Sequence, residues 1–296
     1  MRLIHDATDT KRSSMDQETI DLVAFEERHL DGALQLSREA GWPHRREDWA
    51  MLLALSDGFV MLQGEVVVGT AMMTPFADES ARIAMVIVAA TMRGRGLGRR
   101  LMDAALQACG ERECCLTATA DGLPLYEKLG FRATDEIRQH QGHLRAGTAI
   151  PVPMRGIAWA HAEDFATIAA LDRQALGFDR RTLLHLLAET AQVAILREGD
   201  RITGFGALRP FGRGEVIGPV IAETETQAQA LLSFLINART GTFLRVDTPL
   251  PAGLSPWLAA CGLAHVGGGI AMRRNAASRR PIGPAKPFAL ASQALG

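Results

Sequence analysis

The residues whose types most clearly suggest chemistry lie between Met92 and Met102, in the stretch MRGRGLGRRLM. This stretch places three glycines and four arginines in eleven positions, directly after the apolar run IAMVIVAA. Glycines let a ligand approach the backbone closely, and arginines carry a fixed positive charge that pairs with oxyanions. Together these residue types predict a turn that binds an anion.

The position of this turn in the chain indicates which anion it binds. The preceding run RIAMVIVAA is apolar on both faces, as expected of a central strand buried on both sides. After the glycines, Leu97, Leu101, Ala105 and Ala108 share one helical face, so a helix begins within the stretch. A helix start offers free N–H groups and the positive end of a dipole, which favours a phosphate or a pyrophosphate.

Two common nucleotide-binding motifs do not fit the spacing. The dinucleotide fingerprint GxGxxG, counted from Gly94, would need a glycine where Arg99 stands, and the P-loop lysine is missing. A tight strand-to-helix connection with solvated arginines is the alternative that involves no ligand. The pattern that fits is R-x-x-G-x-G, formed by Arg93, Gly96 and Gly98.

A second motif follows the strand-like segment CCLTATA. It reads DGLPLYEKLGF and contains Tyr126, the only tyrosine of the chain. With the R-x-x-G-x-G turn, it resembles the GNAT N-acetyltransferase superfamily, in which a tyrosine on a short helix precedes Gly-Phe. The sequence LTATADGLPLYEKLGF, together with GWPHRREDW upstream, is similar to GNAT proteins of the YitH or holothin-acyltransferase type. This resemblance extends over most of the chain.

The resemblance implies a co-substrate, acetyl-CoA, and roles for particular residues. It implies that Ile87 and Val88 contact the pantetheine arm and the thioester, and that Tyr126 protonates the leaving thiolate. It also implies that the turn holds the pyrophosphate through Arg93, Gly94, Arg95, Gly96, Leu97, Gly98 and Arg99.

The general base is harder to identify. An alkylamine is mostly protonated at neutral pH, so its proton must be removed before it attacks. Residues 81–92 contain no carboxylate, but Asp78 and Glu79 directly precede that strand and His44 lies beside Trp42. We select Glu79 as the candidate catalytic base, and an ordered water relay to a distant carboxylate is the alternative.

The second half of the chain repeats the first. GWPHRREDWAMLL corresponds to GFDRRTLLHLL, VVVGTAMM to RITGFGAL, and LYEKLGF to WLAACGL, at separations of 136, 135 and 132 residues. Such constant offsets indicate two copies of one folding unit. In the second copy, however, IAETETQAQA replaces the glycine turn and Leu258 replaces the tyrosine. Two glutamates would repel a pyrophosphate, so the second copy is predicted to be degenerate.

These observations predict an α/β (α+β) protein with two GNAT-like domains in tandem. Each is expected to be a mixed, mostly antiparallel sheet flanked by helices, of which only the N-terminal copy binds CoA. The predicted boundaries are an arm (1–17), a catalytic domain (18–142), a linker (143–153), a degenerate domain (154–274) and a tail (275–296). The tail is rich in proline and alanine, which suggests disorder, although its final apolar residues are able to dock onto the body.

Composition excludes several other classes of protein. The chain has 296 residues, a formal net charge of -1 and four cysteines without paired metal-ligand spacing. We expect a cytoplasmic protein, a monomer or homodimer, without a metal and without nucleic-acid or membrane partners. The close pair His140 and His143 is expected to be exposed rather than metal-binding.

The function predicted from these features is acetyl-CoA-dependent N-acetylation of a primary amine on a small molecule. The alternatives are a tandem GNAT acyltransferase that uses another acyl-CoA or a protein N-terminus, and a CoA-binding sensor without turnover. The second domain either stabilises the first or closes the substrate pocket. In the latter case Asp247 and Glu215 would attract a cationic amine.

Overall fold

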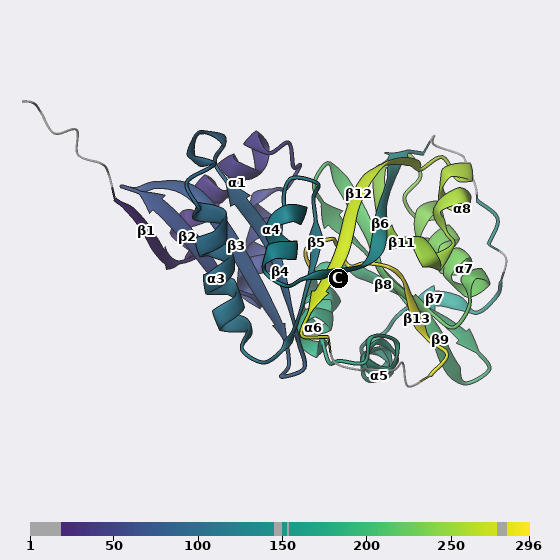
Figure 1. The fold of residues 1–296 in the computed structure, drawn as a ribbon. Helices are drawn as coiled ribbons and strands as arrows, with labels where there is room; N and C mark the ends of the chain where they lie inside the picture. Colours follow the sequence, from purple (N-terminus) through teal and green to yellow (C-terminus); the bar gives the residue numbers. More distant parts are fainter. Residues whose placement is uncertain (1–18, 145–149, 153, 277–282) are drawn as a thin grey trace, which may run out of the picture.

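The computed structural model describes residues 19–144, 150–152, 154–276 and 283–296 (Figure 1). The predicted N-terminal arm, and parts of the predicted linker and tail, lie outside the described residues.

The first half of the chain alternates strands and helices in the order expected. Its elements are β1 (Ile20–Ala24), η1 (Glu27–His29), α1 (Leu30–Glu39), α2 (Arg46–Leu55), β2 (Asp57–Gln63), β3 (Val66–Phe76), β4 (Ser80–Val88), η2 (Ala90–Met92), α3 (Leu97–Cys109), β5 (Glu113–Ala118), α4 (Leu123–Lys128) and β6 (Arg132–His143).

The second half has the same strands and α-helices in the same order, followed by one more strand, but its second 3-10 helix precedes the last α-helix instead of the third. They are β7 (Ile157–Trp159), η3 (Ala162–Asp164), α5 (Phe165–Leu176), α6 (Arg181–Thr190), β8 (Gln192–Glu198), β9 (Arg201–Phe211), β10 (Gly214–Ala222), α7 (Glu225–Asn237), β11 (Phe243–Pro249), η4 (Leu250–Ala252), α8 (Ser255–Ala260), β12 (Ala264–Arg274) and β13 (Lys286–Ala289). The predicted internal repeat is therefore confirmed.

The two halves share one continuous sheet. Its strand order is β1-β2-β3-β4-β5-β12-β6-β11-β10-β9-β8-β7, so β12 lies between β5 and β6, and β6 lies between β12 and β11. Figure 1 shows β6 and β12 side by side at the centre of the molecule. Each half therefore completes its sheet with a strand of the other half, an exchange that the sequence analysis did not predict.

The exchanged strands are antiparallel and closely packed. His140 lies opposite His265, and it is fully buried, with its ring nitrogens 2.9 Å from Leu263 O and 2.8 Å from Ser255 Oγ. The expectation that His140 is exposed was wrong, because β6 runs through the middle of the sheet instead of leading into a linker. His143, at the end of β6, is exposed as expected.

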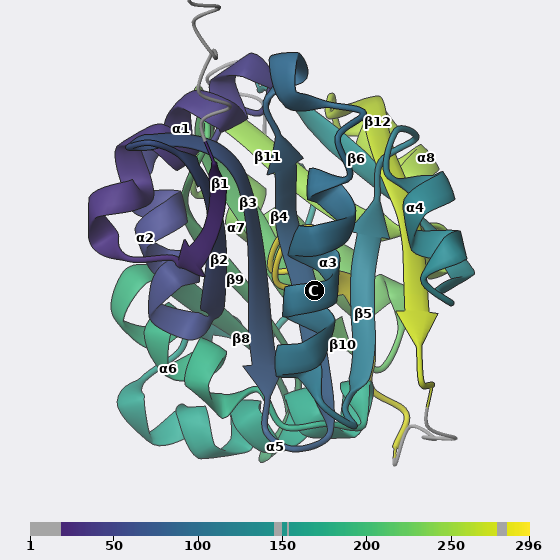
Figure 2. The ribbon, with the colours of Figure 1, turned by 60° about the vertical axis from the view of Figure 1, so that its left-hand side comes forward.

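Helices cover both faces of the sheet. In the first half, α3 lies across one face, and α1 and α2 lie on the other (Figure 2). The apolar stripe of α3 is buried as its spacing predicts, and Leu101 packs closely over Gly69 of β3. On the opposite face, one apolar core joins α1 and α2 to α5 and α6 of the second half. The two halves are therefore held together by shared core as well as by shared strands.

In both halves, the fourth and fifth strands of the repeat separate after a short parallel contact. The pairing of β4 with β5 covers only Ser80–Arg82, and that of β10 with β11 covers only Glu215 and Val216. Each half therefore has a gap in the sheet beyond these pairs.

In the second half, β13 fills this gap. It pairs antiparallel with β10, and two hydrogen bonds tie it to β11: Leu290 N donates to Asp247 O at 2.8 Å and Thr248 Oγ1 donates to Phe288 O at 2.8 Å. Phe288 is fully buried in the core of the second half. Despite its composition, the segment 283–296 thus contributes a strand, Lys286–Ala289, to the sheet.

Gly218 of β10 permits this insertion, and replacing it tests the role of the segment. A Cβ at Gly218 would lie 1.8 Å from Leu290 O, a contact that the backbone cannot accommodate. Gly218→Ala should therefore dislodge the segment and lower the free energy of unfolding in urea by about 2 kcal/mol or more. Limited proteolysis should then cut after Lys286.

The matched control is Gly267→Ala. Gly267 has a similarly unusual backbone angle (φ +141°, against +158° for Gly218), but no atom lies within 4 Å of its added Cβ. Equal stability and equal protease resistance of the two variants would contradict the proposed fit of the segment against β10.

Candidate active site

The glycine turn leaves the start of α3 uncapped. Gly94 and Gly96 adopt left-handed backbone angles (φ +78° and +77°), and no side chain caps the helix at Gly96. The first hydrogen bond of the helix runs from Arg100 N to Gly96 O at 3.1 Å. The amides of residues 97–99 therefore point out of the helix end, where they suit an anion.

Gly98, the third glycine of the turn, differs from Gly94 and Gly96 in its backbone conformation. Its backbone angle is not unusual, and an added Cβ would make only ordinary contacts, 3.5 Å from Leu125 Cδ2 and 3.9 Å from Val88 Cγ2. The packing of the protein therefore does not require glycine at this position. These distances also show that the turn, the end of β4 and helix α4 meet at Gly98.

The arginines of the turn have only weak internal partners. Arg93 lies 3.8 Å from Asp121, and Arg99 Nε lies 3.0 Å from Asp103 one helical turn away, both as exposed pairs. Arg95 makes no ion pair with any residue that the structure describes. Because exposed ion pairs contribute little free energy, these arginines remain available to a phosphate ligand.

The predicted thioester end of the site lies at the end of β4, in the part of this strand that no longer pairs with β5. Ile87 and Val88 pair with Thr70 and Gly69 on β3. A bulge interrupts this ladder at Met85, which has φ +52° and whose carbonyl accepts a 2.8 Å hydrogen bond from Thr70 Oγ1. A bulge bends a strand and redirects its polar groups, here at the edge that faces the gap.

Tyr126 lies on α4, one residue after the Leu125 that packs against the turn. Its side chain is nearly buried, and this burial raises the pKa of the phenol to about 12. The hydroxyl lies near Gly122 and makes no hydrogen bond to a described residue. It is therefore a protonated donor throughout the neutral range.

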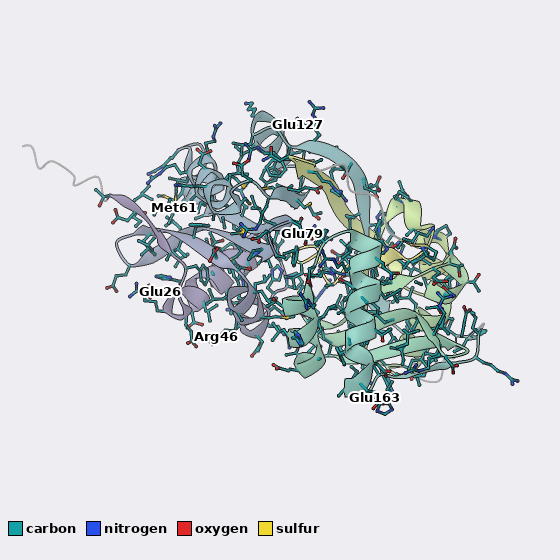
Figure 3. All side chains as sticks on the ribbon, turned by 90° about the horizontal axis from the view of Figure 1, so that it is seen from below. Glu26, Arg46, Met61, Glu79, Glu127 and Glu163 are labelled. Carbon is teal, nitrogen blue, oxygen red and sulfur yellow. The ribbon has the colours of Figure 1, made fainter. Side chains whose placement is uncertain are left out.

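Glu79 lies between the two halves, near the centre of Figure 3. Its carboxylate accepts hydrogen bonds from Arg173 Nη2 at 2.8 Å and from the backbone N of Asp179 at 3.0 Å. Glu79 directly precedes β4, at the opposite end of that strand from the glycine turn. A cavity also opens beside Met85 of β4, and Glu79 does not line it. These contacts support a role in joining the halves, and its role as a base stays a prediction.

A cavity of about 270 Å³ opens on the gap between β4 and β5. The first half contributes the loop between α1 and α2 together with residues in or next to strands, the second half contributes two arginines and one glycine, and the segment 283–296 contributes two residues. The lining comprises Gly41, Trp42, Pro43, His44, Ile83, Ala84, Met85, Thr117, Thr119, Gln139, Arg213, Arg245, Gly268, Gln293 and Ala294.

His44 lies in the wall of this cavity. Burial lowers the pKa of its imidazole to about 4, against the opposing effect of Asp48, so the ring is neutral at neutral pH. Trp49 Nε1 donates to Ser37 Oγ at 2.9 Å, and Ser37 Oγ lies 3.4 Å from His44 Nδ1. The Ser37 hydroxyl therefore links the Trp49 indole to the His44 ring.

The corresponding helix start in the second half is already satisfied by side chains. Gln227 N donates to Thr224 Oγ1 at 3.2 Å, and Gln227 Oε1 accepts from the backbone N of Glu223 and of Thr224. This capping box satisfies the amide of Gln227, which corresponds to the free amide of Arg99 in the first half, and two amides just before the helix. The neighbouring gap is filled by β13, so neither feature of the first site is available in the second half.

The acids expected to attract an amine are both neutralised. Asp247 is fully buried and accepts two hydrogen bonds from Arg245, at 2.9 and 3.0 Å, and one from Gln293 at 2.9 Å. Glu215 pairs with Arg239 at 2.9 Å. These pairings do not support the expectation that Asp247 and Glu215 draw in a cationic amine, because their charges are compensated within the protein, and that expectation stays a prediction.

Two further features of the described residues bear on the sequence analysis. No group of three or more His, Cys, Asp or Glu among them is arranged to hold a metal ion. None of the helices in the described ranges is long and apolar enough to cross a bilayer.

Comparison with known families identifies both halves. Residues 54–133 match one family model described as an acetyltransferase (GNAT) domain, and residues 168–282 match a second family model with the same description.

Individual proteins are similar over larger parts of the chain. The protein named Uncharacterized N-acetyltransferase YitH, from Bacillus subtilis (strain 168), is 28% identical over 235 residues, which are 77% of this chain and 82% of that protein. Holothin acyltransferase from Pseudoalteromonas sp. (strain SANK 73390) is 25% identical over 59% of each chain. The crystal structure of a putative acetyltransferase from Pyrococcus horikoshii covers the whole of both chains with a TM-score of 0.78 at 15% identity, which shows a shared fold.

Replacing Gly98 separates ligand binding from folding. Because alanine is the better helix former and its methyl has room, Gly98→Ala should leave the free energy of unfolding unchanged or raise it by up to about 1 kcal/mol. The methyl should nevertheless keep a pyrophosphate from the amides, and raise the Kd for CoA at least tenfold in calorimetry.

The control is Gly64→Ala, a strained glycine (φ +58°) in the turn between β2 and β3, with no atom within 4 Å of the added Cβ. This variant should lose stability and keep its CoA affinity. Unchanged CoA affinity in Gly98→Ala would contradict the assignment of the turn as the pyrophosphate site.

Proposed function

Because the chain belongs to the GNAT acetyltransferases, we propose that it transfers an acetyl group from acetyl-CoA to a primary amine of a small molecule in the cavity between its halves. The observation that carries this proposal is the uncapped turn at Gly96, which leads along the end of β4 into the open gap beside β5. A cavity of about 270 Å³ at the far side of the gap favours a small acceptor.

The first half has the groups that acetyl-CoA needs. The free amides of residues 97–99 would hold the pyrophosphate, with Arg95 and Arg93 as charge partners. The edge of β4 beyond the bulge at Met85 would contact the pantetheine arm. In the second half, Thr224 and Gln227 cap the helix and β13 fills the gap, which supports a single CoA site in each chain.

The reaction requires one bond to form and one to break. The neutral amine nitrogen attacks the thioester carbonyl, the C–N bond forms, and the C–S bond breaks to release a thiolate. The amine loses a proton and the thiolate takes one up. A phenol with a pKa of about 12 is a weaker acid than a thiol, so Tyr126 acts by donating a hydrogen bond to the departing sulfur.

Removal of the amine proton is assigned to water. His44 has a pKa of about 4, so it is a weak base. Glu79 is bound by Arg173 and by the Asp179 amide outside the cavity. A water relay in the cavity therefore fits the contacts better than either side chain.

The second half takes part by building the acceptor side of the site. Arg213 and Arg245 come from its strands and hairpin, and Gln293 comes from the segment that fills its own gap. Gln293 is held between Asp247 and Gln139, at 2.9 and 3.3 Å. The degenerate copy thus has a function in substrate binding, in addition to stabilising the first.

Removing the phenol hydroxyl tests the proposed reaction. Tyr126→Phe should lower kcat about 100-fold, since one donor to a developing charge is lost, with an unchanged Kd for CoA. Thiol release from acetyl-CoA, measured over a panel of primary amines, provides the assay. Because burial raises the pKa of Tyr126 to about 12, the wild-type enzyme should show no activity loss from its ionisation below about pH 11.

Full activity of Tyr126→Phe would rule out this role for the hydroxyl. Phe131 packs edge to face against the Tyr126 ring, and Phe131→Leu serves as a packing control that should change stability more than kcat.

A further inference from the structure

The acceptor cavity has basic residues in its wall and no acidic ones. Arg213 and Arg245 line it, and none of the residues that line it is an aspartate or a glutamate. This charge balance is unexpected for an enzyme whose acceptor is a simple amine, because such an amine is a cation in solution at neutral pH.

The acids nearest to the cavity are each paired, so Asp247 offsets the charge of Arg245 and leaves Arg213 as the lining arginine that pairs with no described carboxylate. Asp247 is bound by both Nε and Nη2 of Arg245. Asp48 is bound by Arg45 and by the backbone N of Gly212, the latter at 3.0 Å. Both carboxylates are buried and are directed at these partners.

Two buried arginines add positive charge behind the wall. Arg82 donates to Gln293 O at 2.8 Å and to Thr117 Oγ1 at 2.6 Å, both neutral oxygens, and forms no ion pair with a described carboxylate. Arg209 is 3.9 Å from Asp48, which Arg45 already neutralises, and its Nε is buried without a partner. Burial lowers the pKa of each to about 10, so both stay charged at neutral pH.

Two donors in the wall are open to a ligand. Arg245 uses Nε and Nη2 for Asp247, and its Nη1 has no hydrogen bond to a described residue. Arg213 is exposed and makes only a stacking contact with Phe243, at 4.8 Å from the ring centre. These two donors suit an oxyanion rather than a cation.

We propose that the acceptor is a primary amine that also carries an anionic group, a carboxylate in the first instance. Arg213 and Arg245 bind the carboxylate, and the amine of the same molecule faces the gap between β4 and β5. This inference rests on the proposed function, which it deepens by naming the acceptor class.

The same charges also assist the reaction. A positive potential disfavours the ammonium form of a nearby amine, so it lowers the pKa of the acceptor and increases the fraction that is a nucleophile. Arg82 and Arg209 provide this potential without competing for the carboxylate, because both are buried. A site without a strong base can thus still hold a neutral amine.

The test compares amino acids with their decarboxylated amines. Each pair, such as phenylalanine with phenethylamine, shares one side chain and differs in the carboxylate. Binding is measured by calorimetry to the enzyme saturated with CoA, and turnover by thiol release from acetyl-CoA. We expect the preferred amino acid to bind at least tenfold more tightly than its decarboxylated partner.

Arg213→Gln identifies the residue responsible. This variant should reduce the preference for the carboxylate by about tenfold and leave the KM for acetyl-CoA unchanged. Arg155→Gln removes the same charge from an exposed position outside the cavity and should keep the full preference. Because Arg213 is exposed and forms no ion pair, its replacement should not affect folding.

The outcomes distinguish this inference from the proposed function. Equal or tighter binding of the decarboxylated amines, or no binding of any amino acid, would overturn the anionic acceptor. Thiol release with uncharged amines would then still support the proposed function. Tight binding of amino acids without thiol release from any amine would support the anion site and count against acetyl transfer.

Discussion

The arrangement of the whole molecule follows from the early separation of two parallel strands. β4 leaves β5 after three residue pairs, and β10 leaves β11 after two. A gap in a buried sheet exposes backbone N–H and C=O groups that must find partners. The second gap is filled by β13 of the same chain, whereas no described strand fills the first, where we propose that CoA binds. On this proposal, the functional difference between the two copies originates in the two gaps.

Small local differences between the two copies reinforce the contrast between the filled gap and the open gap. At the helix start, Gly96 provides no side-chain cap, whereas the Thr224 hydroxyl accepts a hydrogen bond from the amide of Gln227. In the fourth strand, both copies bulge, at Met85 and near Gly218, and in the second copy the carbonyl of Leu290 lies directly against the bulge. The same segment then continues to Gln293 in the wall of the first copy's cavity. Closing one site therefore helps to build the other.

Sequence analysis predicted the parts of the site that depend on local patterns. The strand, the glycine turn and the amphipathic start of α3 follow from residues within about one element, and so does the tyrosine helix. The repeat was visible because corresponding motifs keep a constant offset. The exchange of β6 and β12 was not visible in the sequence, because it pairs residues such as His140 and His265 that are far apart in the chain. One local signal of this exchange was present in the sequence, the glycine run Gly267–Gly269. A Cβ at Gly268 would lie 1.8 Å from Ile137 O of β6, so the close approach of the two strands requires glycine there. The docking of β13 and the pairing of Asp247 with Arg245 likewise depend on long-range contacts that composition does not reveal.

The central claim is that the gap between β4 and β5 is open to CoA, whereas β13 fills the gap between β10 and β11. A crystal structure with CoA at saturating concentration tests this claim most directly. We predict a single CoA for each chain, with its pyrophosphate at the amides of residues 97–99 and its pantetheine between β4 and β5, while β13 stays paired with β10. A CoA molecule between β10 and β11, or none beside the turn at Gly96, would contradict this account.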